Sequence, residues 1–167
     1  MLRHAVLSDA GAIAAVHLAA WKRAYRGVIP EDYLDGLDLR SREEQWVDRL
    51  GQGAKVLVAD GESGVSGFSS YGASWVDDDS WGELYAIYVH PQYWGRGHGR
   101  RLLEATEEGL RALGYGKAHL WVLDTNRGAR SFYERLGWVE TSMTKVDNIG
   151  GVEVTEVRYD RSPLTTG

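Results

Sequence analysis

The sequence predicts an α/β (α+β) fold built on a mixed, mostly antiparallel sheet of about seven strands. Segments with strand and helix patterns follow one another in the order β, α, α, α, β, β, β, α, β, α, β, β. One helix, at 97–113, joins two strands directly, and such a crossover implies that those strands are parallel. Glycine-containing turns of hairpin type join two of the other strand pairs, which are expected to be antiparallel. We expect one domain at 1–160 and a flexible tail at 161–167.

The N-terminal part of the chain contains one strand followed by three helices. Ser8 is a favourable N-cap residue, and apolar side chains recur on one face of the helix that follows it. Pro30 suits the start of a short helix, because its fixed φ is helical. Ser41 and Glu44 have the spacing of a capping box, which predicts the start of a third helix. The expected elements are a strand at 2–7 and helices at 8–25, 30–35 and 41–50.

The remainder of the chain alternates strands with two further helices. The turns at 61–64 and 148–151 have the composition of hairpin turns, and Gly114 and Gly137 end the two helices. The first of these helices is expected to bury the face formed by Leu102, Leu103, Thr106, Leu110 and Leu113. The expected elements are strands at 54–60, 65–76, 83–89, 117–123, 138–146 and 152–159, and helices at 97–113 and 126–136.

Composition excludes several classes of function. The 167 residues carry a net charge of −5 and no cysteine, which rules out disulfides, thiolate metal sites and cysteine nucleophiles. The five histidines show no i,i+4 pair, so we expect no metal site. A negative net charge opposes nucleic-acid binding, which depends on neutralising phosphates. No apolar run reaches the roughly 20 residues that span a bilayer, and no signal-peptide core follows Met1, so we expect a cytoplasmic protein without membrane contact.

A glycine-rich segment after the strand at 83–89 is the strongest sign of a binding site. Gly95, Gly97 and Gly99 let the backbone approach a ligand closely, and the first N–H groups of the next helix point into this loop. With the helix dipole they favour an anion such as phosphate. Arg100 replaces the third glycine of a dinucleotide fingerprint, and no Lys-Ser/Thr follows, so neither a Rossmann loop nor a P-loop is expected. The alternative is a plain glycine-rich turn with solvated arginines.

Two motifs resemble those of the GNAT superfamily of N-acetyltransferases. The segment 94–99 resembles its acetyl-coenzyme A signature, Arg/Gln-x-x-Gly-x-Gly/Ala, which lies at a helix start. Trp94 stands where the family usually has Arg or Gln. The segment 126–138 resembles the later family block, Asn-x-x-Ala-x-x-Phe-Tyr-x-x-x-Gly-Phe. The two motifs occur in the family's order, about one helix and one strand apart.

The resemblance implies a GNAT-like fold, with helices on both faces of a twisted sheet and the strands at 84–89 and 117–123 splayed apart at one end. It implies acetyl-coenzyme A as co-substrate, with the diphosphate on the helix start and the pantetheine arm between the splayed strands. The residues expected to bind it are Ile87, Tyr88, Val89, Gly95, Arg96, Gly97, His98, Gly99, Arg100, Asn126 and Tyr133.

Two side chains are candidates for proton transfer. Glu83 opens the central strand and is a candidate base for the acceptor amine, whose ordinary pKa is about 10.4; the alternative is a solvated carboxylate at a strand edge. By resemblance, the Tyr133 hydroxyl protonates the departing thiolate; the alternative is an aromatic core residue on a helix. Asn126 is expected to bind the pantetheine arm, and its alternative role as a helix N-cap can hold at the same time.

The expected acceptor is a primary amine, carried by a small, amino-acid-like compound or by a peptide. Trp21 and Tyr25 lie four residues apart on one helical face and could form an aromatic wall for a cation, although such pairs are more often core. Glu83 and Tyr85 are the other expected acceptor contacts. Two alternatives stay open: acetylation of protein N-termini or lysines, and a non-catalytic module that binds acyl-coenzyme A. A homodimer also stays open.

Overall fold

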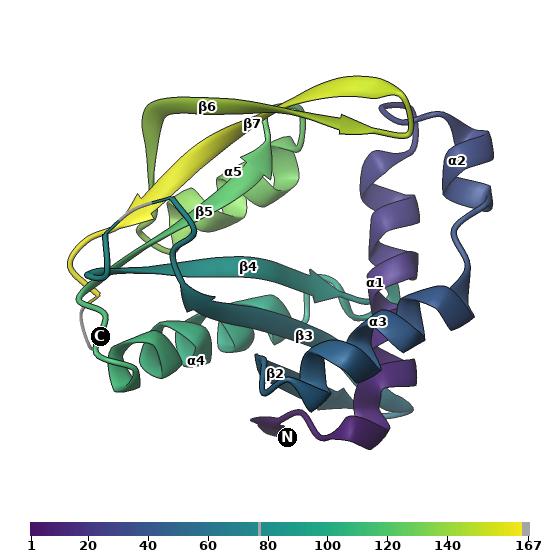
Figure 1. Cartoon of the computed structure of the whole chain (residues 1–167), viewed down its shortest axis with the longest axis horizontal. Helices are drawn as coiled ribbons and strands as arrows, with labels where there is room; N and C mark the ends of the chain where they lie inside the picture. The colour runs from purple at the N-terminus through teal and green to yellow at the C-terminus, as the bar shows by residue number, and fades with distance from the viewer. Residues whose placement is uncertain (77, 165–167) are drawn as a thin grey trace. The chain divides into compact units, whose positions relative to one another are not determined.

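The computed structural model describes residues 1–76 and 78–164 (Figure 1). The chain forms two compact units, and each unit is made of two segments of sequence. The first unit comprises Met1–Tyr71 and Ala86–Thr106, and the second comprises Gly72–Tyr85 and the chain from Glu107 onward.

Within the described residues the sheet contains seven strands: β1 (Leu2–His4), β2 (Lys55–Gly61), β3 (Gly64–Ala73), β4 (Trp81–Val89), β5 (Lys117–Leu123), β6 (Val139–Ile149) and β7 (Val152–Arg161). Their order in the sheet is β1-β2-β3-β4-β5-β7-β6. β4 and β5 are parallel, whereas β1–β2, β2–β3, β5–β7 and β6–β7 are antiparallel. The predicted mostly antiparallel sheet with one parallel pair is confirmed.

The parallel register between β4 and β5 is short. It covers four residue pairs, from Trp81–Lys117 to Leu84–Leu120. β5 continues for three more residues, 121–123, which pair with β7 on its other side. The end of β5 is therefore held in the sheet through its antiparallel neighbour.

The helical elements among the described residues are η1 (Leu7–Asp9), α1 (Ala10–Tyr25), α2 (Glu31–Asp35), α3 (Leu39–Gly51), η2 (Pro91–Tyr93), α4 (His98–Ala112) and α5 (Arg127–Arg135). Ser8 does not cap α1 as predicted, because it lies within η1, a 3₁₀ turn. The N-cap of α1 is instead Asp9, whose carboxylate accepts a hydrogen bond from the N–H of Val6 at 2.8 Å.

Two further helix predictions need correction. α3 begins at Leu39 rather than at Ser41, because the Asp38 carboxylate accepts the Ser41 N–H at 2.9 Å and caps the helix earlier. α4 buries four of the five residues expected on its inner face, but Leu113 is 45% exposed. α4 ends at Ala112, so Leu113 lies beyond the last residue of the helix.

Helices cover both faces of the sheet in the first unit, as expected. Phe68 of β3 lies in a buried cluster with Ile13 of α1 and Trp46 of α3. Ser69, the next residue along β3, points to the opposite face because side chains alternate along a strand. On that face its hydroxyl contacts the Thr106 hydroxyl of α4 at 2.7 Å. α1 and α3 therefore pack on one face and α4 on the other.

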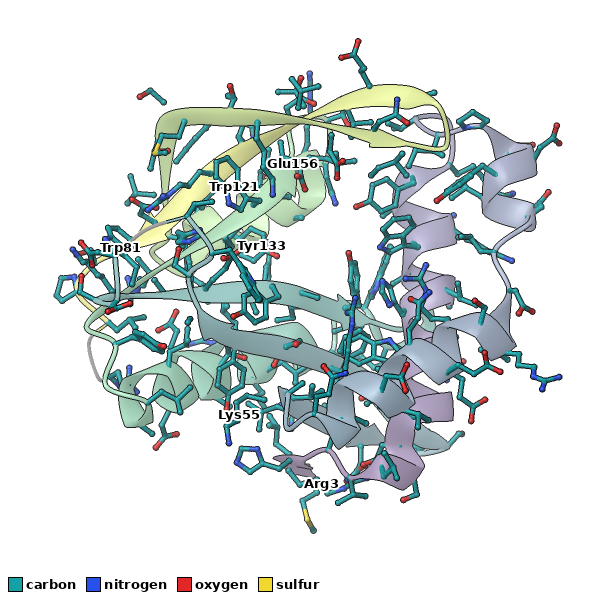
Figure 2. The ribbon with its side chains drawn as sticks, in the orientation of Figure 1. Arg3, Lys55, Trp81, Trp121, Tyr133 and Glu156 are labelled. Carbon is teal, nitrogen blue, oxygen red and sulfur yellow. The ribbon has the colours of Figure 1, made fainter. Side chains whose placement is uncertain are left out.

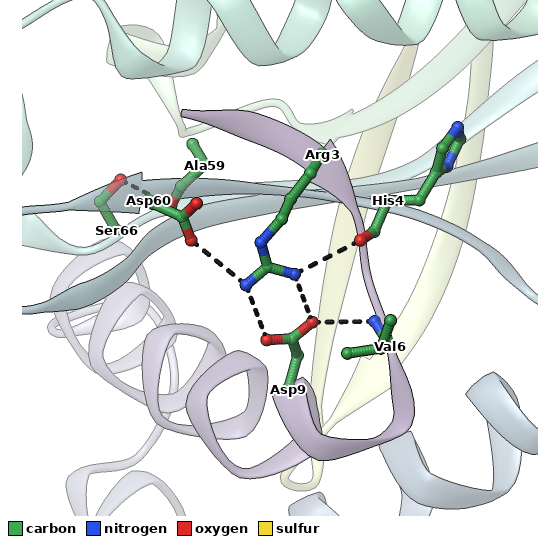
Figure 3. Close-up of polar contacts among 7 residues, drawn as sticks. All are labelled: Arg3, His4, Val6, Asp9, Ala59, Asp60 and Ser66. Carbon is green, nitrogen blue, oxygen red and sulfur yellow. Dashed lines mark hydrogen bonds and ion pairs between the residues drawn. The ribbon is translucent and has the colours of Figure 1, made fainter.

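Arg3 connects β1 to η1 and β2 (Figure 3). Its guanidinium donates to both carboxylate oxygens of Asp9, at 2.7 and 3.0 Å, and to Asp60 Oδ1 at 3.3 Å. A bidentate pair of this kind fixes orientation as well as charge. The hydrogen bond from Arg3, opposed by burial and supported by the N–H of Val6, lowers the pKa of Asp9. The N-terminal strand is thus fastened to the rest of the first unit.

The C-terminal segment is folded further than the predicted tail. β7 continues to Arg161. Beyond it, Leu164 is buried, and its N–H donates to the Gly116 carbonyl at 2.8 Å. The chain up to Leu164 therefore belongs to the second unit, whereas 165–167, the rest of the predicted tail, lie outside the described residues.

Candidate active site

The loop that precedes α4 has the geometry of an anion cradle. Gly95 and Gly97 have φ angles of 75° and 80°, in the left-handed region that favours glycine. A Cβ atom added at either position would meet no protein atom within 4 Å, so the loop faces open space. α4 begins at His98, and the first N–H groups of a helix have no acceptor within it. Open backbone and unpaired N–H donors together suit a diphosphate.

The arginines beside this loop already contact protein groups. Arg100 Nε lies 2.7 Å from Glu104 Oε1, one turn further along α4. The Arg96 guanidinium lies 5.7 Å from the centre of the Tyr93 ring. Both arginine side chains are exposed, and water and salt screen an exposed ion pair so that it is weak. Little free energy therefore opposes their turning toward a bound anion.

His98 anchors the loop through its side chain. Its Nδ1 lies 2.7 Å from Ser66 Oγ, and the Ser66 hydroxyl donates its only proton to the Ala59 carbonyl at 2.9 Å. His98 Nδ1 must therefore carry the proton and donate to Ser66. Burial, with Arg101 and Arg96 nearby, lowers the pKa of His98 below its ordinary value of 6.5. His98 is thus a neutral anchor, and only its backbone N–H remains for a ligand at the helix start.

Trp94 has a structural role at the position where the family has Arg or Gln. Its indole N–H donates to the Val89 carbonyl, the last residue of β4, at 2.7 Å. The backbone N–H of the next residue, His90, donates to the Ser66 carbonyl at 2.8 Å. The end of β4 and the start of the loop are therefore held at a fixed distance in the first unit.

Tyr88 contributes its side chain to an aromatic cluster in the first unit. The Trp21 indole donates to the Tyr88 hydroxyl at 2.9 Å, and the Tyr88 ring stacks on His17 with centroids 5.0 Å apart. His17 Nδ1 accepts the Trp46 indole N–H at 3.3 Å, while burial, with Arg42 and Arg49, lowers its pKa to about 3. Neutral His17 is therefore part of the core that holds Tyr88.

The predicted aromatic pair is present on α1. The Trp21 and Tyr25 ring centroids are 4.6 Å apart. The guanidinium of Arg42, on α3, lies 5.7 Å from the centre of the Trp21 ring. A cation of the protein itself therefore occupies one face of this wall.

Glu83 lies in the second unit and is only 9% exposed, so the interpretation of a solvated strand-edge carboxylate is wrong. Its Oε2 accepts the N–H of Trp75 at 3.2 Å. The same oxygen lies 3.6 Å from Nε2 of His119, the residue opposite it in the parallel register. His119 Nε2 also contacts Ser74 Oγ at 2.7 Å. A buried carboxylate next to titratable partners is a typical setting for proton transfer.

Tyr85, two residues along β4, faces the same side as Glu83. Its hydroxyl donates to the Ala73 carbonyl at 2.5 Å, and its ring lies 6.2 Å from that of Trp75. Burial, followed by the charges of Glu83 and Tyr115, raises the pKa of Tyr85 to about 12. Tyr85 is still 39% exposed. It is therefore a neutral phenol with surface left for a ligand.

Tyr133 and Asn126 belong to α5 and its cap. Tyr133 is buried, and its ring lies 6.4 Å from Trp138 and 6.2 Å from Tyr159. Asn126 Oδ1 accepts the N–H of Ala129 at 3.2 Å, so the N-cap interpretation of Asn126 is confirmed. Because the oxygen is the capping atom, the amide NH₂ is the end of this side chain that suits a ligand carbonyl.

The predicted residues therefore fall into two sets. The first unit holds the glycine loop, Ile87, Tyr88, Val89, Trp21 and Tyr25, and the second holds Glu83, Tyr85, Asn126 and Tyr133. Over the residues described, no group of three His, Asp or Glu side chains is placed to hold a metal ion. In the same residues, none of the helices has the length and apolar character needed to cross a bilayer.

Comparison with known proteins identifies the family. The acetyltransferase (GNAT) family matches residues 16–138. The chain belongs to the GNAT family. An uncharacterized N-acetyltransferase of Bacillus subtilis, YuaI, is 38% identical over 75% of this chain and 72% of its own length. The L-amino acid N-acyltransferase MnaT of Escherichia coli is 28% identical over 84% of this chain and 80% of its own length.

Other relatives are longer or more distant. A mycothiol acetyltransferase of Nocardiopsis dassonvillei is 35% identical over 72% of this chain, which spans only 38% of that relative. The structure of yncA from Salmonella typhimurium, determined with its cofactor acetyl-CoA, has a TM-score of 0.73 at 23% identity and covers 100% of this chain and 95% of its own. A ribosomal-protein-alanine N-acetyltransferase of Brucella melitensis has a TM-score of 0.76 at 23% identity, over 97% of this chain and 99% of its own. These structures share the GNAT fold.

Sequence reasoning missed His119, which lies beside Glu83, and Ser74, which contacts His119. His119 and Ser74 lie on strand β5 and at the end of β3, more than 30 residues apart from each other in sequence. The available signal was that His119 falls in an apolar strand predicted to be parallel to that of Glu83. The register could not be derived, because the sequence does not show which residue of β4 lies opposite which residue of β5. Even the start of β4, at Trp81, lies two residues before the predicted one. In this GNAT protein, only the pairing of the strands shows which residue faces Glu83.

Proposed function

We propose that this GNAT protein transfers an acetyl group from acetyl-coenzyme A to the primary amine of a small, amino-acid-like compound, by direct attack in a ternary complex. The observation that carries the proposal is the open glycine loop at the start of α4, at the position of the family's cofactor signature. The E. coli relative named as an L-amino acid N-acyltransferase supports the acceptor class. So does Arg42 beside Trp21, since a guanidinium favours an acceptor with a carboxylate.

The residues that would hold acetyl-coenzyme A fit that role. N–H groups from Gly95 to Arg100 are suited to the diphosphate, with the Arg96 side chain adding positive charge. The backbone of 87–89 and the amide of Asn126 are suited to the amides of the pantetheine arm. When bound, acetyl-coenzyme A supplies a thioester carbonyl that a neutral amine can attack. The protein must position that carbonyl, remove a proton from the ammonium group of the acceptor and supply a proton to the departing sulfur.

Glu83 is the proposed base. An alkyl ammonium has a pKa of about 10.4, so it must lose a proton before it can attack. In this step the ammonium N–H bond breaks, its electron pair stays on nitrogen, and the proton forms an O–H bond at the Glu83 carboxylate, directly or through one water. The N–H of Trp75, which bonds Oε2, holds the carboxylate in place.

Tyr133 is the proposed acid. When the C–N bond has formed and the C–S bond breaks, the electron pair of the C–S bond goes to sulfur, and the Tyr133 hydroxyl supplies a proton to it. The nitrogen, which became positively charged on attack, loses its second proton, which restores the neutral Tyr133 hydroxyl. A phenol with a pKa of about 10 and a thiol of about 8.5 are close enough for this transfer. The aromatic packing around Tyr133 supports the role by fixing its ring. Trp21, Tyr25 and Tyr85 are the proposed acceptor contacts.

Two measurements test this function. Calorimetry should find binding of acetyl-coenzyme A, and a thiol-release assay should find turnover on some members of a panel of L-amino acids, simple amines and peptides. Tyr133→Phe should bind acetyl-coenzyme A as the wild type does and lower kcat about 100-fold, the lower end of the range for acid–base groups.

The other outcomes point to different functions. Absence of binding would contradict the proposal. Binding without turnover of any amine would identify a non-catalytic module, and turnover confined to peptides would identify a protein acetyltransferase. Wild-type turnover by Tyr133→Phe would remove Tyr133 from the mechanism.

A further inference from the structure

The second unit contains a buried polar group that the proposed reaction does not yet use. His119 Nε2 lies 2.7 Å from Ser74 Oγ and 3.6 Å from Glu83 Oε2. His119 is 0% exposed, and its ring lies 6.2 Å from that of Trp81 and 6.3 Å from that of Trp121 (labelled in Figure 2). A histidine placed in the middle of a sheet between two indoles is costly to bury unless its polar atoms are used.

The strand register makes this arrangement rigid. Glu83 and His119 are opposite each other in the parallel pair of β4 and β5, where the ladder fixes both backbones. Ser74 follows β3, and its N–H donates to the Trp81 carbonyl at 3.0 Å. The N–H of Trp75 bonds Glu83 Oε2, so the carboxylate is held from the same turn. All of these contacts lie within the second unit.

One tautomer of His119 suits both neighbours of its Nε2 atom. With a bare Nε2, the Ser74 hydroxyl would donate to it, but a second negatively polarised atom would then lie 3.6 Å from Glu83 Oε2. A protonated Nε2 instead donates to Ser74 Oγ, and its positive N–H end lies near the carboxylate. The Nε2–H form therefore favours the ionised state of Glu83, which is the state that accepts a proton.

We propose that His119, together with Ser74, is a positioning residue for Glu83: its Nε2–H orients the Glu83 carboxylate and holds it in the form that receives the proton of the acceptor amine. The inference rests on the proposed function, because it gives a role to the partners of the proposed base. It assigns no bond-making step to His119 itself.

A first test needs neither substrate nor turnover. In ¹⁵N-labelled protein, long-range ¹⁵N–¹H spectra of the histidine rings should show His119 protonated at Nε2. Glu83→Gln and Ser74→Ala should each shift the His119 Nε2 resonance. His4, an exposed histidine of the first unit, is the control and should not change. An unprotonated Nε2, or a His119 Nε2 resonance that does not shift in Glu83→Gln, would overturn the inference.

A second test measures kinetics with the acceptor that the thiol-release assay identifies. His119→Phe should lower kcat about 10-fold, a fraction of the roughly 10²–10⁴ that a positioned base contributes, and leave the KM for acetyl-coenzyme A unchanged. His119→Gln, whose amide can still donate to Ser74, should recover most of kcat. The matched controls His4→Phe and His4→Gln should behave as the wild type.

The outcomes separate the two proposals. A wild-type kcat in folded His119→Phe, or equal losses in the Phe and Gln variants, would overturn the role of His119 while the enzyme activity stands. Failure of the wild type to turn over any amine would reject the proposed function. In that case the ring spectra alone decide whether His119 holds Glu83. If His119→Phe does not fold, Ser74→Ala replaces it, with a smaller expected loss of kcat.

Discussion

At the scale of single residues, two glycines of the glycine loop before α4 are required by the backbone conformation rather than by packing. Gly95 and Gly97 have positive φ angles, and a Cβ at either would meet only open space. In the proposed function, glycine there serves the ligand as well as the backbone, because an added methyl group would stand where the diphosphate is proposed to bind. His98 lies between Gly97 and Gly99, and its side chain contacts Ser66.

Gly97→Ala should therefore weaken binding of acetyl-coenzyme A at least 10-fold in calorimetry, with a loss of about 1–2 kcal/mol in unfolding free energy from left-handed strain. Gly53→Ala is the matched control, since Gly53 has a φ of 84° and equally open surroundings, in the turn after α3. It should lose the same stability and keep full affinity. Equal affinity in the two variants would show that the loop does not hold the diphosphate.

His17 makes the stability of the protein depend on pH. Its folded pKa, about 3, lies below the ordinary value of 6.5, so the unfolded chain binds more protons between these values. Stability should therefore fall as the pH drops from about 6.5 toward about 3, by at most about 1.4 kcal/mol per pH unit for this one group. Urea unfolding across this range should show the slope, and His17→Gln should make it shallower. An unchanged slope would contradict neutral burial of His17.

At the scale of elements, short polar contacts decide where strands and helices begin. Asp38 caps α3 three residues before Ser41, the predicted cap, and Asp9, at the N-cap position of α1, uses its carboxylate on Arg3 and the N–H of Val6. Local sequence rules count each candidate cap separately and so miss such shared contacts.

Asp9→Asn should lower the unfolding free energy at pH 7 by about 1–2 kcal/mol, because it weakens the charge-assisted pair with Arg3. The folded pKa of Asp9 is lowered, so its contribution is present above the unfolded pKa of about 3.9 and is lost as the pH falls through the folded value. The difference between variant and wild type should therefore shrink in acid. Asp48→Asn, at an exposed carboxylate on α3, is the control and should change little at any pH.

At the scale of the whole molecule, ligand binding should couple to folding stability. A ligand that binds only the folded chain, at 100 times its Kd, stabilises it by about 2.7 kcal/mol, which corresponds to a rise in Tm of roughly 5–10 °C for a chain of this size. Acetyl-coenzyme A should give this shift in a thermal melt. Adenosine, which lacks the diphosphate, should give none, and an equal shift with adenosine would place the binding energy outside the glycine loop.

Much of the architecture could be predicted from the sequence. The parallel pair followed from one helix between two strands, and all seven strands and the start of α4 were located to within a few residues. These features depend on local periodicity and on the positions of glycines, and both can be read from a short stretch of sequence. The predictions for Leu113, after α4, and for the segment 161–164 were wrong, because the exposure of Leu113 and the burial of Leu164 depend on the residues packed around them.

The sequence predicted one part of the candidate site better than the other, because only one part is a continuous segment. The glycine loop is a continuous segment, so its composition alone indicated an anion site. Glu83 was singled out by its place in a strand, yet neither its burial nor its partners could be derived. Both depend on the register of β4 against β5, in which a shift of one residue would exchange His119 for a neighbour on the opposite face.

The sequence alone was enough to place this chain among the GNAT proteins and to predict an anion site at the start of one helix, because a glycine loop, a helix N-terminus and two motifs are local properties of the chain. The folded chain was needed to show which residues surround Glu83, which histidines are neutral anchors, and which arginine lies beside the aromatic pair. Those are contacts between distant segments, and strand register and helix packing, rather than the order of residues, create them.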